Sequence, residues 1–369
     1  MSRKKRAVTH LPLHPVALQV PGEVREGVIR SRSQAHVGEA GSPRLIYSRC
    51  GLPYSVLLRL HVLRKSKRAM YDVIVIGGGP AGLNAAMILG RSRRKVIVFD
   101  GGQPRNRWSD NMNGFLTSDG MNPRDFIKKG RAELQKYSIE MKDIEISSAT
   151  YSKGQFVVND AEGTVYHTRK LLLATGLKDN WPQLERFEEF YGKSIHHCPY
   201  CDGWESRDKA IAVYGKGRSG IGQALAMKNW SADVTLYTDG TDKLRRSDLE
   251  LLELNGVKVA REKITQLEGE DGMLRHIVVQ GGEKRAQQAL FFSEGTKQQS
   301  ALGKMLGCEF TNKGVIKTRR LQQSNIPGLY VAGDAARDMQ MVIVAAAEGA
   351  KAGVAINMDL QKEDRKTVA

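Results

Sequence analysis

Two strand–glycine–helix units constrain the fold of this chain more than any other feature. Residues 71–82 and residues 209–220 each carry a β-branched or apolar run that leads into a G-x-G-x-x-G motif and then into a predicted helix. In this setting the first glycine permits a tight turn, the second lets the backbone approach a pyrophosphate, and the third lets the helix pack closely on the strand. The repeated pattern predicts an α/β protein with two dinucleotide-binding domains, each a Rossmann-like three-layer ββα arrangement.

The first unit contains every part of a dinucleotide site. A predicted helix at residues 83–91 follows the glycines, and a second strand at residues 95–99 ends at an acidic residue 21 positions after the middle glycine. An acid in this place holds the ribose hydroxyls of an adenosine. A glycine-rich turn of another α/β fold is the alternative. The candidate binding residues of this unit are Gly77, Gly79, Pro80, Ala81, Gly82 and Asp100.

Two later strand ends are candidates for the same site. Residues 170–176 form an apolar run that ends in the small residues Ala174, Thr175 and Gly176, which would let the backbone pass close to a cofactor. A strand end without a ligand is an equally good interpretation of that turn. Residues 326–334 form a turn and a buried strand that end in Gly333 and Asp334, where the carboxylate would reach the ribityl or pyrophosphate region of a flavin.

The second unit predicts a second dinucleotide. Its candidate binding residues are Gly215, Gly217, Gly220 and Asp239. Asp239 lies 22 positions after Gly217, behind a strand at residues 233–237, and would favour the 2′-hydroxyl of NADH. Lys243, Arg245 and Arg246 could instead bind the 2′-phosphate of NADPH, or could simply be solvated cations at a helix start. We expect FAD and NADPH as cofactors, with NADH as the alternative.

A Cys-x-x-Cys motif stands between the two units, at Cys198-Pro-Tyr-Cys201, and Asp202 follows it directly. Such a pair can close into a disulfide or open into a dithiol, and a helix start lowers the pKa of its thiols. A carboxylate beside the second sulfur could shuttle a proton. Because a nicotinamide gives up a hydride and a disulfide takes two electrons through a flavin, redox chemistry is the favoured interpretation of the pair.

Zinc binding is a weaker explanation of the same motif. His196 and His197 precede the pair, but zinc usually takes four ligands from two separated pairs, and Cys50 and Cys308 are single and remote. A structural disulfide is similarly disfavoured, because four cysteines in 369 residues is not a secreted, bridge-dense composition. We expect no metal site and a cytoplasmic location.

The charge of the chain is concentrated at its amino-terminal end. The formal net charge is +17, but residues 1–69 carry 14 Lys and Arg against three Glu, so residues 70–369 contribute only +6. A nucleic-acid partner would depend almost wholly on the first segment, and we expect none. No apolar run is long enough to cross a bilayer. Residues 1–69 are predicted to be disordered or a non-native extension ahead of a start at Met70.

These motifs together resemble the low-molecular-weight thioredoxin reductase family of flavoprotein disulfide reductases, over residues 70–369. The resemblance rests on Gly77-Gly-Gly-Pro-Ala-Gly82, Ala174-Thr-Gly176, Cys198-Pro-Tyr-Cys201-Asp-Gly203, Gly215–Gly220 and Gly333-Asp334, in the family's order. It implies an NAD(P)H domain inserted in an FAD domain, and a homodimer. The implied domains are residues 70–186 and 291–369 for FAD and residues 187–290 for NAD(P)H and the Cys pair.

The resemblance also implies roles for three residues. Cys201 would lie against the flavin, Cys198 would attack the substrate disulfide, and Asp202 would be the acid/base. The substrate would be a thioredoxin-like protein or a small-molecule disulfide, reduced by NAD(P)H through FAD.

Three departures from the family pattern favour an alternative. Tyr237-Thr-Asp239 replaces the family's His-Arg-Arg, Gln340-Met-Val342 replaces Arg-Gln-Ala, and Cys-Pro-Tyr-Cys stands where Cys-Ala-Thr-Cys is frequent. These features look closer to the branch of gliotoxin-type dithiol oxidases. The alternative function is oxidation of a small dithiol, with the electrons passing through FAD to oxygen.

Overall fold

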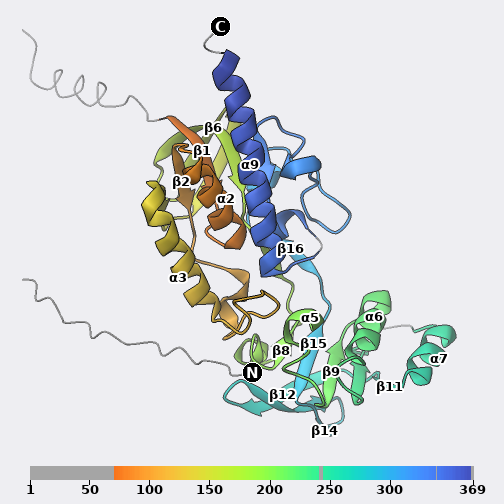
Figure 1. Cartoon of the computed structure of the whole chain (residues 1–369). Coiled ribbons are helices and arrows are strands. Elements are labelled where there is room, and N and C mark those ends of the chain that lie inside the picture. Colours follow the sequence, from red (N-terminus) through yellow and green to blue (C-terminus); the bar gives the residue numbers. More distant parts are fainter. Residues whose placement is uncertain (1–69, 241–243, 338, 367–369) are drawn as a thin grey trace, which may run out of the picture. The chain divides into compact units, whose positions relative to one another are not determined.

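The computed structural model describes residues 70–240, 244–337 and 339–366 (Figure 1). The prediction made for residues 1–69 lies outside the described residues, as does Lys243. Among the described residues, no helix combines the length and the apolar character that a membrane crossing needs.

The first sheet joins parallel strands to an antiparallel meander. Its order is β3-β2-β1-β6-β5-β4, and β17 pairs with β6. β1, β2, β3 and β17 run parallel to their partners, whereas β4, β5 and β6 form antiparallel pairs. The bounds are β1 Met70–Ile76, β2 Val96–Phe99, β3 Glu140–Lys142, β4 Ile146–Ser152, β5 Gln155–Asp160, β6 Val165–Leu173 and β17 Leu329–Val331.

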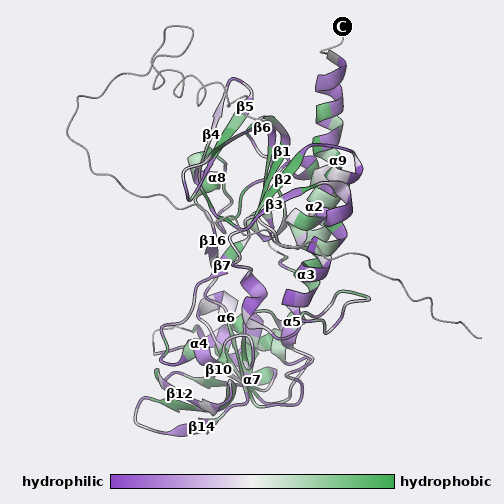
Figure 2. Cartoon of the chain, turned by 90° about the vertical axis from the view of Figure 1, so that its left-hand side faces the viewer, coloured by the Kyte–Doolittle hydropathy of each residue, from purple (hydrophilic) through white to green (hydrophobic). Residues whose placement is uncertain are grey.

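Alternating side chains of β1 build two cores, one on each face of this sheet. Ile74 and Ile76 pack with the meander, whereas Val73 and Val75 pack against helices α2 (Pro80–Arg91) and α9 (Val342–Lys366). Figure 2 shows the meander strands on one side of β1 and the two helices on the other. All four side chains are buried, which agrees with a near-continuous apolar strand covered on both faces.

The second sheet repeats the three-layer plan. Its five strands are all parallel, in the order β11-β10-β9-β15-β8. Helices α6 and α7 cover one face, and an antiparallel sheet of β12, β13 and β14 covers the other. The bounds are β8 Ile195–His196, β9 Ile211–Tyr214, β10 Val234–Tyr237, β11 Val257–Ala260, β12 Ile264–Glu270, β13 Met273–Val279, β14 Lys284–Ala286, β15 Ala289–Phe292, α6 Gly217–Met227 and α7 Arg246–Leu254.

Two short antiparallel strands bracket the second sheet in the sequence. β7 (Leu177–Asp179) follows the first sheet's β6, β16 (Thr296–Gln298) follows β15, and the two pair with each other. The chain therefore leaves the first sheet, builds the second, and returns to add β17. The predicted fold class, an α/β protein with one dinucleotide-type domain inserted in another, is confirmed.

Several element boundaries differ from the sequence predictions. α2 and α6 begin inside their glycine motifs, at Pro80 and Gly217, rather than after them. α7 ends at Leu254, and the next strand, β11, begins at Val257. The remaining helical elements are η1 Arg105–Trp108, α3 Pro123–Leu134, η2 Gln135–Tyr137, α4 Phe187–Phe190, α5 Pro199–Asp202, α8 Leu302–Met305, η3 Arg320–Gln322 and η4 Gly333–Ala336.

Candidate active site

The first glycine motif has one position open to space and two in tight contact. A Cβ on Gly77, whose φ is +113°, would lie 2.1 Å from the carbonyl oxygen of Ala174. A Cβ on Gly82 would lie 1.8 Å from the carbonyl oxygen of Gly77. Gly79, the N-cap of α2, has no heavy atom within 4 Å of its Cβ position. Two glycines are therefore required by the turn, and the middle one leaves room for a ligand at the helix start.

A cavity of about 850 Å³ opens beside this turn. That size suits a large cofactor. The predicted residues that line it are Gly77, Gly79, Pro80, Ala81, Asp100, Ala174, Thr175, Gly176, Cys201, Asp202, Gly333 and Asp334. Gly82 lies behind the turn, in contact with Gly77. Segments far apart in the sequence thus converge on one space, with Cys201 at its edge.

The chemistry of the walls fits a dinucleotide with a pyrophosphate. α3 contributes the cations Arg124, Lys128 and Arg131 to the lining, and they would favour an anionic ligand. Asp100, predicted to hold ribose hydroxyls, lies at the same end and pairs with Arg131 Nη2 at 2.7 Å. The open Gly79 position and this charge pattern show that the residues present fit a dinucleotide with a pyrophosphate, such as a flavin dinucleotide.

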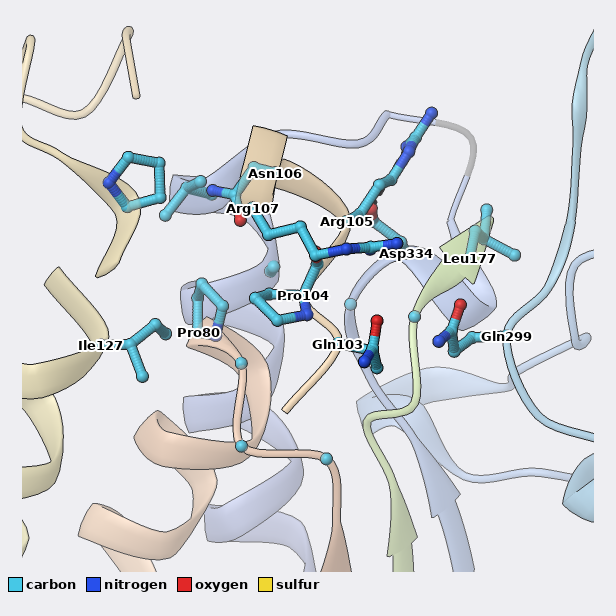
Figure 3. A pocket seen from close by; sticks show the side chains of 18 of the residues that line it. Pro80, Gln103, Pro104, Arg105, Asn106, Arg107, Ile127, Leu177, Gln299 and Asp334 are labelled. Carbon is cyan, nitrogen blue, oxygen red and sulfur yellow. Dashed lines mark hydrogen bonds and ion pairs between the residues drawn. The ribbon is translucent and has the colours of Figure 1, made fainter. Parts of the chain in front are cut away.

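Arg105 is the main charged residue of the cavity wall that sequence reasoning did not single out. It belongs to η1, in the long and largely irregular stretch between β2 and α3. Its guanidinium binds both carboxylate oxygens of Asp179 and lies 3.3 Å from Asp334 Oδ2 and 2.5 Å from Gln340 Oε1. Figure 3 shows Arg105 beside Asp334 in the wall of the cavity. One side chain therefore connects η1, β7 and η4.

The network continues towards the Cys pair. Tyr191 donates a hydrogen bond to Asp179 Oδ2 at 2.7 Å, and His197 Nδ1 lies 3.3 Å from the Tyr191 hydroxyl and 4.0 Å from Asp179 Oδ2. A carboxylate on β7 is thus shared between Arg105 on one side and the segment that precedes Cys198 on the other.

Burial and pairing shift the pKa values of this network. Burial is the largest single effect on Asp179 and would raise its pKa, but the hydrogen bonds and charge of its neighbours, Arg105 first among them, together outweigh burial and the pKa is lowered. Burial raises the pKa of Asp334, and nearby Arg105 only partly offsets that effect. Burial, helped by the positive charge of Arg105, lowers the pKa of His197 to about 4. His197 is therefore neutral at pH 7 beside an ionised Asp179.

The Cys pair forms a disulfide at one helical turn, α5. Cys198 is the N-cap of this turn, and Cys201 is inside it. Asn113 Nδ2 donates a hydrogen bond to the carbonyl oxygen of Cys201 at 2.9 Å, which fixes α5 to the stretch after η1. His196 Nδ1 lies 3.3 Å from Asp202 Oδ1, and both side chains are largely buried. The cavity lining includes Cys201 and Asp202 but not Cys198.

The second glycine motif lies outside this cavity. Gly215, Gly217 and Gly220 join β9 to α6, and Asp239 follows β10; none of the four lines the cavity. The structure therefore brings the first motif and the Cys pair together and keeps the second motif apart from them. Arg105, Asp179, Tyr191 and Asn113 are site residues that sequence reasoning missed; only the long irregular stretch around Arg105 gave a signal for them.

The family model for pyridine nucleotide-disulphide oxidoreductases matches residues 71–349. The chain belongs to this family. This oxidoreductase is 31% identical over 278 residues to a protein of Claviceps purpurea named thioredoxin reductase tcpT, covering 71% of this chain and 86% of that protein. Membership confirms the predicted enzyme class and implies the use of a flavin and NAD(P)H.

Solved structures agree with this placement. A putative thioredoxin reductase TrxB from Bacillus anthracis is 32% identical, with a TM-score of 0.76 over 80% of this chain and 99% of that one. A crystallised protein named HlmI is 34% identical, with a TM-score of 0.78 over 81% of this chain and 95% of that one. The resemblance of this oxidoreductase to the low-molecular-weight thioredoxin reductases is confirmed.

Proposed function

We propose that the enzyme is an FAD-dependent thiol–disulfide oxidoreductase that takes electrons from NAD(P)H and passes them through Cys198 and Cys201 to a disulfide substrate. The observation that carries this proposal is the convergence of the first glycine motif and Cys201 on one cavity of about 850 Å³. The substrate would be a thioredoxin-like protein or a small-molecule disulfide. We propose a homodimer as the working form, on the resemblance to the thioredoxin reductases.

The two sulfurs have different surroundings, which supports different roles. Cys201 lines the cavity, which supports a role for it in receiving electrons there. Cys198 is the N-cap of α5 and lies outside the cavity lining, which supports a role for it in attacking the substrate. FAD would supply two-electron transfer between a nicotinamide and a disulfide, held by residues 77–81, Asp100 and Asp334.

The exchange with substrate needs only the two cysteines and the substrate disulfide. The Cys198 thiolate attacks one substrate sulfur, the substrate S–S bond breaks, and a mixed disulfide forms as one substrate thiolate leaves and takes a proton. Cys201 then attacks the Cys198 sulfur, which restores the Cys198–Cys201 disulfide and releases the second substrate thiol. Reduction of that disulfide consumes two electrons and two protons.

Asp202 and His196 are the groups placed to move those protons. Asp202 adjoins Cys201 in the chain and lines the cavity, and its carboxylate faces the His196 ring at 3.3 Å. The imidazole would orient the carboxylate, which supports a role for Asp202 in proton transfer at the Cys pair.

An anaerobic titration tests the proposal. NADPH or NADH, added to the purified flavoprotein without oxygen, should bleach the flavin absorbance, and a disulfide substrate should restore it. Cys198→Ser protein should retain flavin bleaching and lose turnover of the disulfide. Turnover by Cys198→Ser at the wild-type rate would refute the proposed route.

Oxidation of a small dithiol is the second candidate function. It is favoured by Gln340, the first residue of the segment Gln340-Met-Val342 that replaces the family's Arg-Gln-Ala. Gln340 accepts a hydrogen bond from Arg105 in the cavity wall. In this direction a dithiol would reduce Cys198–Cys201 and oxygen would be the final acceptor. Oxygen uptake driven by a dithiol without any nicotinamide would support it, and its absence, with NAD(P)H-driven disulfide reduction intact, would exclude it.

A further inference from the structure

The second glycine motif is built as a nucleotide turn. Gly215 and Gly220 are in contact, since a Cβ on Gly220 would lie 2.5 Å from the carbonyl carbon of Gly215. Gly217 has a φ of +54° and no heavy atom within 4 Å of its Cβ position. The buried hydroxyl of Ser293 has no hydrogen-bond partner in the structure, and its oxygen would lie 2.4 Å from a Cβ on Gly215. Close packing, an open middle glycine and an unpaired buried hydroxyl together fit a bound dinucleotide.

Asp239 is held firmly beside this turn. It follows β10, the strand that pairs with β9, and adopts a left-handed φ of +56°. Tyr214 donates a hydrogen bond to its Oδ2 at 2.9 Å, the Ile264 amide donates to its Oδ1 at 3.3 Å, and Lys216 Nζ lies 3.9 Å from Oδ2. Its side chain is only 14% exposed. The carboxylate is fixed, yet a carboxylate has about four acceptor positions, so sites remain for two ribose hydroxyls.

The neighbouring arginines are engaged by carboxylates of their own. Arg245 binds Asp248 through its Nε at 2.9 Å and its Nη2 at 2.8 Å, in the first turn of α7. Arg246 binds Glu250 at 2.8 Å on the same helix. Both arginines are solvent-exposed, Arg245 at 65% and Arg246 at 93%, so these pairs oppose a 2′-phosphate only weakly. The main obstacle to a 2′-phosphate, which carries a charge of about −1.5 to −2, is the Asp239 carboxylate.

We propose that the second motif binds NADH in preference to NADPH, and that Asp239 is the residue that makes this selection. The inference rests on the proposed use of a nicotinamide dinucleotide. The fixed carboxylate accepts hydrogen bonds from the 2′- and 3′-hydroxyls of NADH and repels the 2′-phosphate of NADPH.

Equilibrium binding tests this selection without turnover. Isothermal titration calorimetry on the oxidised holoenzyme, with NAD⁺ and NADP⁺ at one fixed ionic strength, gives two Kd values. We expect NAD⁺ to bind at least about tenfold more tightly, equivalent to about 1.4 kcal/mol. Asp239→Asn keeps the size of the side chain and tolerates the left-handed backbone. This variant should reduce the ratio of the NADP⁺ Kd to the NAD⁺ Kd by about fivefold or more.

Asp233→Asn is the matched control. Asp233 stands immediately before the opposite end of β10, is 48% exposed, and pairs with Lys258 at 2.9 Å. The variant removes one negative charge from the same strand without touching the turn, so the ratio of Kd values should stay at the wild-type level. Full flavin content and retained NAD⁺ binding show that each variant is folded.

Three results would overturn the inference: tighter wild-type binding of NADP⁺, a ratio unchanged in Asp239→Asn, or binding of neither nucleotide. The last result separates this inference from the rest of the proposed function. If neither nucleotide bound but a dithiol still bleached the flavin through Cys198 and Cys201, the exchange between flavin and disulfide would stand and only the nicotinamide site would fall.

Discussion

The two glycine motifs share a pattern but differ in what lies opposite them. Gly77–Gly82 faces a cavity whose walls come from α3, η1, η4 and α5, and those walls carry buried charges and Cys201. Gly215–Gly220 lies outside that cavity, and its main charged neighbour is Asp239, held beside the end of β9. Local turn chemistry therefore sets the backbone at both places, while segments distant in the sequence decide which turn faces the cavity that Cys201 lines.

The largest expected effect concerns the buried charges of the first region. Arg105→Met leaves the carboxylates of Asp179 and Asp334 without their cation, at 4% and 21% exposure. Removing one partner of a buried ion pair costs about 3–5 kcal/mol, so unfolding in urea should show a loss of that size, together with loss of flavin.

Arg285→Met in the second domain is the control for Arg105→Met. Arg285 binds Glu262 at 2.7 Å and lowers the pKa of that carboxyl to about 2, but Glu262 is 43% exposed and water replaces the lost partner. The loss of stability should be several times smaller than for Arg105→Met. Equal losses would contradict the contrast between the two regions.

The next largest effects come from two glycines of the first motif, one required for packing and one expected to contact the cofactor. Gly82→Ala places a methyl group 1.8 Å from a backbone oxygen and should destabilise the protein by about 2–3 kcal/mol. Gly79→Ala points its methyl group into open space, so unfolding should stay near wild type while flavin affinity falls by about tenfold. Flavin absorbance per protein measures the second effect.

Gly220→Ala completes this comparison at the second motif. Its methyl group would lie 2.5 Å from Gly215, so the variant should lose stability. Protein that remains folded should keep its flavin, because this turn lies outside the first cavity. Loss of flavin from folded Gly220→Ala protein would show that flavin binding at the first turn depends on the second turn.

The smallest expected effect is a pH dependence of stability that comes from His197, in the wall of the cavity beside the first glycine motif. Burial lowers the pKa of His197 from 6.5 to about 4 in the folded state, so between these values the unfolded chain binds a proton that the folded protein does not. Stability should therefore fall as the pH drops from 6.5 to 4. Because the ring is 29% exposed, we expect a loss of at most about 2 kcal/mol.

His197→Gln should flatten this part of the stability profile, measured by urea unfolding at several pH values. Arg105 stays in place in the variant and continues to lower the pKa of Asp179, so Asp179 keeps its main partner. An unchanged slope in His197→Gln would mean that another group causes the acid sensitivity.

The sequence predicted the elements whose signal is local. Apolar strands such as Met70–Ile76 and Ile211–Tyr214, and the glycines that follow them, were found because their pattern needs no partner to be recognised. The last turns of α9 carry no such local signal, because they are polar. Ion pairs hold those turns, from Arg94 and Arg169 to Asp364 at 2.7 and 2.8 Å.

The cavity wall was the least predictable part of the candidate site. Arg105 meets Asp179 and Asp334 across 74 and 229 positions of the chain, and no periodicity marks such pairs. The role given to Cys201, the sulfur against the flavin, came from the family resemblance and stays a prediction, although Cys201 does line the cavity. Contacts between distant loops depend on how the two sheets are joined, which residue spacing does not encode.

The absorbance spectra of two single-cysteine variants test the central claim most directly. If Cys201 is the sulfur beside the flavin, Cys198→Ser protein at about pH 8 will show a long-wavelength thiolate–flavin band, and Cys201→Ser protein with equal flavin content will not. The band in Cys201→Ser alone, or in neither variant despite full flavin, would contradict the electron path that the cavity defines.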